Sequence, residues 1–297
     1  TLDRSSAASD VYKRQVYNTC AGYAFNTTGQ RRDITGDDQS AGPYDDQVAF
    51  MRDAGALATS LVDEGYKAMK IWPFDIYAPA SAGHMISLPD LEKGLQPFRQ
   101  IREAVGNRIE VMCELHSLFG AHSALRICQA LEEFGVFWVE DPLNKMDDPQ
   151  GLADLRRRTR VPICGSETLG GLRPFRDLLA QDALDVVMLD LAWCGGFTEG
   201  RKIAALAQAY NKPLAPHDCT GPITLMAGLH MALHAPTAIY QEVVRATLAT
   251  WYRDIVTHLP VIDNGMALPP TAVGLGTRLA PAFKQKPGLI VRETRKA

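Results

Sequence analysis

The sequence predicts an α/β fold in which a parallel sheet closes into a (β/α)8 barrel of the TIM type. Three observations support this prediction. From Val16 onward, short β-branched strands alternate with helical stretches, and strict alternation implies parallel strands joined by right-handed crossovers. Eight such units occupy the roughly 250 residues of a typical barrel. No strand is followed by a glycine-rich phosphate loop, which disfavours an open doubly wound sheet.

The individual elements follow from periodicity and from β-branched runs. VYNTCAG (16–22) reads as the first strand, and apolar residues at steps of three and four predict a helix over 44–64. YKAMKIW (66–72) is the second strand, 73–90 is an insertion, and a helix follows over 89–105. The remaining units are strand 108–114, helix 121–134, strand 136–140, helix 149–158, strand 161–165, helix 173–181, strand 185–190, helix 197–209, strand 213–216, helix 222–234 and strand 238–242.

The two ends of the chain are expected to stand apart from the barrel. The stretch SSAASDVYKRQ (5–15) resembles the in-frame translation of a sequencing-library adapter, so residues 1–15 are treated as non-native. The native part is then expected to begin at Val16 as a truncated frame, with the barrel over 16–244. Residues 245–297 are richer in Pro and Gly and are expected to fold back as a C-terminal appendage.

The composition is that of an ordinary globular protein. The chain has 297 residues, of which 46% are hydrophobic, and a formal net charge of −3, which allows a large core. It contains no apolar window of about 18 residues that could span a bilayer, and no basic run of the kind that binds nucleic acid. Its six cysteines show no metal-type pair spacing and no signal peptide is visible, so we expect reduced thiols in a cytoplasmic protein.

Ionisable residues recur at the C-terminal ends of the expected strands. Seven strands carry one at or just past this end: Lys70, Glu114, Glu140, Glu167, Asp190, His217 and Glu242. In a barrel these ends meet at one funnel, where active sites form. A single residue of this kind is more often a solvated loop group, but seven in register indicate a functional site.

Three of these residues, Glu114, Glu140 and Glu167, come from adjacent strands. Carboxylates crowded into one funnel repel one another unless a cation compensates their charge. Three carboxylates suit a hard, oxygen-ligated divalent ion that keeps open positions for substrate and water. Mg²⁺ is therefore the expected metal.

Two histidines are candidates for proton transfer. Asp190 and His217 come from neighbouring strands, and a carboxylate bonded to one imidazole nitrogen raises the basicity of the other. His217 is thus a candidate general base oriented by Asp190. His116 lies two residues after Glu114, so both are expected to point the same way. It would be a second proton carrier beside the metal, although a strand-end histidine can also merely cap a loop.

Seven segments together resemble the mandelate racemase group of the enolase superfamily, over residues 16 to about 280. They are GYKAMKIW, VMCELH, WVEDP, GSET, LDLAWCGGFTEGRKIA, APHDCTGP and QE, in that order. The resemblance implies a barrel whose Mg²⁺ holds a substrate carboxylate while a base removes the neighbouring proton. It assigns metal ligation to the three glutamates, the base dyad to His217 and Asp190, and electrophilic help at the carboxylate to Lys70 and Glu242.

Departures from the group's pattern indicate which reaction to expect. Lys70 and Trp72 should face the same cavity, and racemases of the group carry a second lysine where this chain has Trp72. The lysine that muconate cycloisomerase relatives use at the end of strand six corresponds to Trp193. Indole transfers no proton at neutral pH, so these tryptophans are expected, with Lys70, to bind substrate. His116 instead resembles the general acid of galactonate-type acid-sugar dehydratases.

The resemblance therefore implies a Mg²⁺-dependent dehydratase acting on a small-molecule sugar acid, an aldonate or aldarate, to give a 2-keto-3-deoxy acid. His217 would remove the C2 proton and His116 would protonate the leaving 3-hydroxyl. Two alternatives stay open: an epimerase, racemase or cycloisomerase of a hydroxy acid, and a truncated barrel that only binds metal. Members of the group carry an N-terminal α+β cap. Residues 1–15 cannot form one, so we expect a truncated cap, on which 245–297 would pack, and a homo-oligomer when full length.

Overall fold

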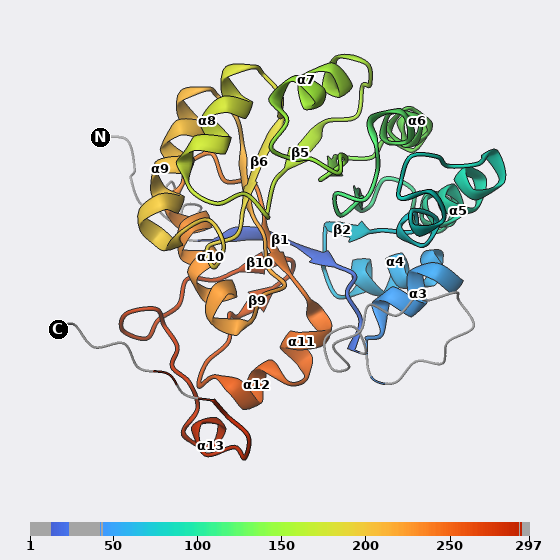
Figure 1. The fold of residues 1–297 in the computed structure, drawn as a ribbon. Helices are drawn as coiled ribbons and strands as arrows, with labels where there is room; N and C mark the ends of the chain where they lie inside the picture. The colour runs from blue at the N-terminus through green and yellow to red at the C-terminus, as the bar shows by residue number, and fades with distance from the viewer. Residues whose placement is uncertain (1–12, 24–41, 43, 291, 293–297) are drawn as a thin grey trace, which may run out of the picture.

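Parallel strands alternate with helices along the computed structural model, which describes residues 13–23, 42, 44–290 and 292. The strands lie at the centre and the helices lie around them (Figure 1). The strands of the alternating part are β1 (Arg14–Thr19), β2 (Ala68–Ile71), β3 (Glu110–Glu114), β4 (Val139–Glu140), β5 (Ile163–Gly165), β6 (Val186–Leu189), β7 (Leu214–Pro216) and β8 (Gln241–Val243). The helices are α3 (Asp46–Arg52), α4 (Ala54–Asp63), α5 (Leu88–Val105), α6 (Ala121–Leu131), α7 (Pro149–Arg157), α8 (Leu172–Ala180), α9 (Gly196–Ala209) and α10 (Pro222–His234).

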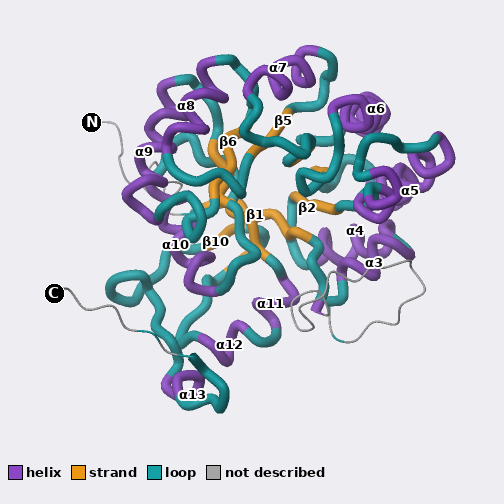
Figure 2. Tube along the Cα trace, viewed as in Figure 1, coloured by secondary structure: helices purple, strands orange, loops and turns teal. Residues whose placement is uncertain are grey.

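The sheet curls so that its first and last strands meet. Each strand from β1 to β7 pairs in parallel with the next one. β8 pairs in parallel with β1, with Tyr17 opposite Glu242, and a parallel bridge between Leu214 and Ala238 joins β7 to the approach to β8. The strands therefore enclose a common interior (Figure 2), which confirms the predicted α/β barrel.

Side chains alternate between this interior and the helices, as the two-residue period of a strand requires. On β3, Met112 belongs to the buried cluster inside the barrel, while Val111 and Cys113 pack in the larger cluster beneath the helices. The strands together supply the interior cluster: Tyr17, Ala68, Met112, Trp138, Cys164, Val186, Met188, Ala215 and Tyr240. Their side chains fill the barrel, so any site must lie at its ends.

The helix predicted over 44–64 is wrong in one respect, because the structure divides it at Asp53. Asp53 is not helical, with φ −149° and ψ 78°, and its carboxylate accepts a hydrogen bond from the Ala56 N–H at 2.9 Å. Aspartate competes with helix continuation by capping the next helix. The chain thus forms α3 and α4 as separate helices. The insertion before α5 forms two short 3₁₀ turns, η1 (Asp75–Tyr77) and η2 (Pro79–Ser81).

The residues after β8 fold back onto the barrel, in the lower part of Figure 1. They form α11 (Arg245–Ala249), α12 (Tyr252–Ile255), β9 (Ile262–Asp263), β10 (Met266–Ala267) and α13 (Pro281–Lys284). β10 pairs antiparallel with the start of β1, where Arg14 is opposite Ala267. β1 therefore begins within the segment that the sequence predicts to be non-native, of which residues 1–12 lie outside the described part. None of the described helices is long and apolar enough to cross a membrane.

Candidate active site

The polar residues of the site continue the inward-facing rows of the strands. Each of these residues lies two positions after the last buried interior side chain of its strand. They are Lys70 on β2, Glu114 on β3, Glu140 on β4, Asp190 after β6, His217 after β7 and Glu242 on β8. A strand places side chains two apart on the same face. The apolar rows that fill the barrel therefore end in a polar layer at the C-terminal end of the strands. All six of these residues are buried.

Glu167 also lies in this polar layer, although it does not occupy an inward-facing position of its strand. The inward position of β5 after Cys164 is Ser166, whose hydroxyl donates to Asp141 Oδ2 at 2.8 Å. Glu167 lies one residue further on, in the loop, and its Oε2 is 3.2 Å from His217 Nε2. Glu167 thus lies at the polar layer, but strand periodicity does not explain its direction.

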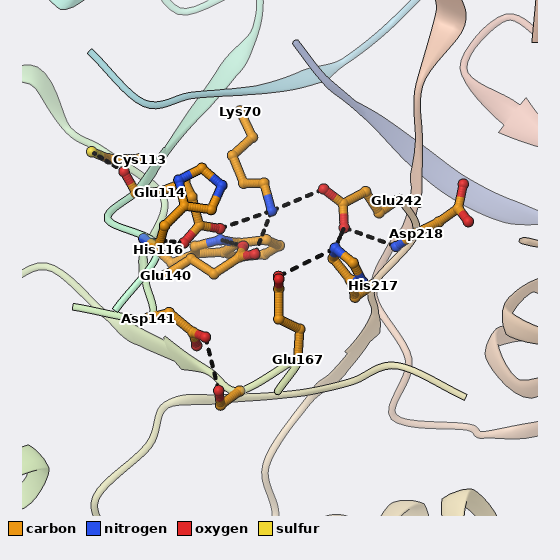
Figure 3. Close-up of polar contacts among 12 residues, drawn as sticks. Lys70, Cys113, Glu114, His116, Glu140, Asp141, Glu167, His217, Asp218 and Glu242 are labelled. Atoms are coloured by element: carbon orange, nitrogen blue, oxygen red, sulfur yellow. Dashed lines mark hydrogen bonds and ion pairs between the residues drawn. The ribbon is translucent and has the colours of Figure 1, made fainter. Parts of the chain in front are cut away.

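The carboxylates of Glu114, Glu140 and Glu167 form one cluster. An oxygen of each lies within 4.8 Å of the others. Lys70 Nζ lies 3.1 Å from Glu114 Oε2 and 2.8 Å from Glu242 Oε1, and it also contacts Glu140 Oε1. Figure 3 shows these side chains converging on one space.

One ammonium does not neutralise this set of carboxylates. Burial, followed by the charge of Glu114, raises the pKa of Glu140 well above its usual range. Burial also acts to raise the pKa of Glu114, but the charges of Lys70 and His116 hold it below its usual value. Three crowded oxygen donors with uncompensated negative charge fit a hard divalent cation. The donor set therefore agrees with the expected kind of ion.

Asp190 and His217 form the expected pair. His217 Nδ1 is 2.8 Å from Asp190 Oδ2, which also accepts from the Thr220 hydroxyl at 3.0 Å, while Asp190 Oδ1 accepts from the Ala192 N–H at 2.6 Å. Trp193 stacks on the imidazole, with ring centroids 5.5 Å apart. The carboxylate is fixed from two sides, so His217 presents Nε2 to the cavity.

The charge state of His217 depends on the carboxylates around Nε2. Burial alone would lower the pKa of His217, but Glu167 and Glu242 raise it well above its usual value. A dication on Glu167 would offset part of the charge that raises this pKa. A divalent ion in the carboxylate cluster would thus favour the neutral, basic form of His217.

His116 reaches the cavity through a turn and not through the strand period that the sequence suggests. β3 ends at Glu114, and His116 and Ser117 adopt left-handed backbone with φ of 47° and 57°. The His116 N–H donates to Glu114 Oε1 at 2.7 Å, and the Trp72 ring packs edge-on against the imidazole at 5.4 Å. Trp72 is 5% exposed and also contacts Phe50. It therefore holds His116 in place besides lining the cavity.

Sequence reasoning missed Asp75. This residue lies in the insertion after β2, and its Oδ2 is 2.6 Å from His116 Nδ1. Burial alone would lower the pKa of His116, but Asp75 and Glu114 raise it to about 9. Asp75 has no strand-end position that would mark it, so only the folded insertion brings it to His116. The structure thus contains two histidines that each have a carboxylate at Nδ1.

A cavity of about 180 Å³ joins these parts. The predicted site residues that line it are Lys70, Trp72, Glu114, His116, Glu167, Trp193, His217 and Glu242. Glu140 and Asp190 lie behind it and contact Lys70 and His217. A second cavity of about 330 Å³ shares His116 and Glu167 with the first and extends over Ser117, Asn144 and Lys145. The predicted residues are therefore adjacent, and space continues beyond them for a longer molecule.

Fold and site define an α/β-barrel protein with a polar, acidic centre at the C-terminal ends of its strands. The chain belongs to the family described as enolase C-terminal domain-like, whose model matches residues 53–283. The resemblance noted in the sequence is thereby confirmed at the level of the superfamily.

Curated relatives of this chain are sugar-acid dehydratases by name. The chain is 33% identical to D-xylonate dehydratase of Haloferax volcanii over 72% of this chain and 52% of that protein. It is 30% identical to arabinonate dehydratase of Saccharolobus solfataricus over 64% of this chain and 50% of that protein. It is also 30% identical to D-galactonate dehydratase of Xanthomonas oryzae pv. oryzae, over 63% and 48% respectively. The chain spans about half the length of these relatives.

Solved structures of the superfamily share the fold. An enolase protein from Sargasso Sea environmental sequencing is 56% identical, with a TM-score of 0.82 over 96% of this chain and 69% of that one. A mandelate racemase subgroup enolase from Agrobacterium tumefaciens is 42% identical, with a TM-score of 0.79 over 92% of this chain and 66% of that one.

Proposed function

We propose that the chain is the barrel of a Mg²⁺-dependent acid-sugar dehydratase, which removes the C2 proton of an aldonate or aldarate and eliminates the 3-hydroxyl. The observation that carries this proposal is the pair of histidines at one cavity. His116 follows β3 and His217 follows β7, which are four strands apart in the curled sheet. An acid and a base on different sides of a bound molecule suit an elimination.

The proposed substrate carboxylate would bind beside Lys70 and the carboxylate cluster. Glu114, Glu140 and Glu167 would hold Mg²⁺, which when bound supplies Lewis-acid stabilisation of the negative charge that develops on the substrate carboxylate. Lys70 Nζ, already within 3.1 Å of Glu114 and 2.8 Å of Glu242, adds fixed positive charge to the same end. Preorganised charge of this kind usually supplies a large share of the rate enhancement.

The histidines would carry the proton transfers. His217 Nε2 takes the C2 proton, and Asp190 stabilises the imidazolium from Nδ1. The resulting enediolate expels the 3-hydroxyl as the C3–O bond breaks, and His116 gives this oxygen a proton to release water. A His116 pKa of about 9 keeps its imidazole protonated at neutral pH, as a general acid requires. The enol then takes a proton at C3 and becomes the 2-keto-3-deoxy acid.

Trp72 and Trp193 support elimination over two-base racemisation. Both rings line the cavity at positions where relatives with other reactions carry lysine bases, and neither can exchange a proton at neutral pH. Each packs against one of the histidines. In the proposal they bind the sugar chain and hold the imidazoles.

The names of the relatives support a sugar acid as the substrate class. Because this chain spans about half of each, the choice among sugar acids is proposed to depend also on an α+β cap, which does not lie among the described residues. The second cavity, over Asn144 and Lys145, is proposed to receive the distal hydroxyls.

The His116→Asn variant tests the division of roles between the histidines. With Mg²⁺ and an aldonate that the unchanged chain dehydrates, the variant should still exchange the C2 proton with deuterated water, because His217 is intact. Elimination should fall by about 10²- to 10⁴-fold, the usual contribution of one acid or base. Nuclear magnetic resonance follows both events. Loss of exchange together with elimination would contradict the assignment of His116 as the acid alone.

A further inference from the structure

A second group of metal-binding atoms lies beside the carboxylate cluster. It consists of a ring nitrogen of His217, Cys219 Sγ and a carboxylate oxygen of Glu242, all within 4.8 Å of one another. Cys219 follows His217 by two residues after β7, and Glu242 lies on the neighbouring strand β8. All three line the cavity of about 180 Å³. They use nitrogen, sulfur and oxygen, unlike the all-oxygen carboxylate cluster.

Cys219 differs from the other cysteines in its access to the cavity. The remaining thiols, at 20, 113, 128, 164 and 194, are buried, whereas Cys219 is partly exposed. Its sulfur lies within 4.8 Å of a ring nitrogen of His217. The catalytic proposal gives this thiol no role, so its position beside the base is unexplained by that reaction.

The spacing of two of these atoms is close to that of neighbouring ligands in a tetrahedral zinc site. His217 Nε2 and Glu242 Oε2 are 3.8 Å apart, while zinc bonds of about 2.0–2.2 Å to nitrogen and oxygen place two such ligands about 3.4 Å apart. A shift of a few tenths of an ångström would bring this nitrogen and this oxygen to that spacing. Asp190, 2.8 Å from Nδ1, is the outer carboxylate that metal-binding histidines usually have.

We infer that His217, Cys219 and Glu242 form a binding site for a borderline-soft divalent cation of the zinc type. A thiolate with an imidazole selects such an ion over Mg²⁺, which prefers oxygen ligands. Binding releases the thiol proton to solvent and uses the lone pair on Nε2. That lone pair is the one that takes the C2 proton in the proposed reaction, so zinc at this site inhibits it.

Cobalt spectroscopy tests the site directly. The chain is titrated with Co²⁺ in excess Mg²⁺, so that Mg²⁺ fills the carboxylate cluster. Co²⁺ bound at Cys219 should produce a thiolate-to-cobalt charge-transfer band in the near ultraviolet, which Zn²⁺ then abolishes by displacing it. Cys219→Ser should lose the band, and the control Cys194→Ser, which removes a nearby thiol outside the trio, should keep it. No band in the unchanged chain, or a band that survives Cys219→Ser, would overturn the inference.

Alkylation gives a second test that needs no variant. Iodoacetamide should label Cys219, and Zn²⁺ added in excess Mg²⁺ should slow this labelling, followed by mass spectrometry of the peptide. An unchanged labelling rate would count against the site. In equilibrium dialysis, Cys219→Ser should weaken Zn²⁺ binding by more than tenfold, since even outer-shell changes cost about 10- to 100-fold. Equal affinity in both chains would contradict a thiolate ligand.

The inhibition rests on the proposed function, whereas the binding does not. Zn²⁺ should stop C2 proton exchange in the unchanged chain, and Cys219→Ser should need more than tenfold more Zn²⁺ for the same loss. If the chain catalyses no exchange even without Zn²⁺, the proposed function fails, and the cobalt band alone decides the metal site. If exchange persists with one Zn²⁺ bound at Cys219, the ion does not bind His217 Nε2 and the inhibitory role is wrong.

Discussion

At the scale of single residues, the site is built on two imidazoles that each have a carboxylate at Nδ1. His217 is held by Asp190 at 2.8 Å and His116 by Asp75 at 2.6 Å. The pairs differ in what faces the cavity. His217 Nε2 lies beside Glu167, a ligand expected to share its charge with a metal, whereas Asp75 and Glu114 raise the pKa of His116 to about 9. Similar pairs can therefore serve as base and acid.

Asp75→Asn tests the acid side of this arrangement. Removing the carboxylate lowers the pKa of His116 and frees its ring to turn. Elimination at neutral pH should therefore fall by about tenfold or more, up to the roughly 10²- to 10⁴-fold that acid–base catalysis usually contributes. C2 proton exchange in deuterated water should remain, because His217 keeps its partner. Asp63→Asn, at an exposed carboxylate on α4, is the control. Equal loss of both reactions would argue that Asp75 only stabilises the fold.

At the scale of elements, strand periodicity explains most of what the sequence predicts. Lys70, Glu114 and Glu140 lie two residues past buried interior side chains. The two-residue period of the strand therefore places them on the same inward face as the core residues before them. The loops carry no such rule. The turn at His116, the pairing of Asp75 and the direction of Glu167 depend on tertiary contacts between segments distant in sequence. Periodicity therefore predicts the strand-end residues, and folding of the loops supplies the rest.

The N-cap at Asp53, which separates α3 from α4, should contribute measurably to the free energy of unfolding. Periodicity predicts one helix across it, but the Asp53 carboxylate caps α4 by accepting from the Ala56 N–H. Asp53→Ala should lower the free energy of unfolding by about 0.5–2 kcal/mol, the usual cost of losing an N-cap. Urea unfolding of this variant beside Asp63→Ala, at the other end of α4, makes the comparison. An equal change in both would mean that the cap contributes nothing specific.

At the scale of the whole molecule, the C-terminal segment is attached to the barrel by a buried ion pair. The Arg245 guanidinium, at the start of α11, donates to both oxygens of Asp46 at 2.8 Å and to Glu64 Oε1 at 2.8 Å. Its backbone N–H donates to Asn18 on β1 at 2.8 Å. One residue thus links the segment after β8 to β1, α3 and α4.

Arg245→Ala should therefore destabilise the molecule strongly. It leaves the buried Asp46 carboxylate without its cation, and breaking a buried pair from one side costs about 3–5 kcal/mol. Urea unfolding provides the measurement, and Arg253→Ala, at an exposed arginine of α12, should change the free energy of unfolding by less than about 0.5 kcal/mol. A small effect of Arg245→Ala would show that the C-terminal segment is held by its other contacts.

The proposed reaction of this barrel is removal of a C2 proton followed by elimination of water. The most direct measurement is nuclear magnetic resonance of aldonates and aldarates incubated with the chain and Mg²⁺ in deuterated water. One of them should be converted to a 2-keto-3-deoxy acid with deuterium at C3, where the enol takes its new proton from solvent. Deuterium at C2 with every hydroxyl retained and the configuration at C2 inverted would instead indicate an epimerase or racemase. Mg²⁺ binding without consumption of any acid would show that the chain is not a dehydratase.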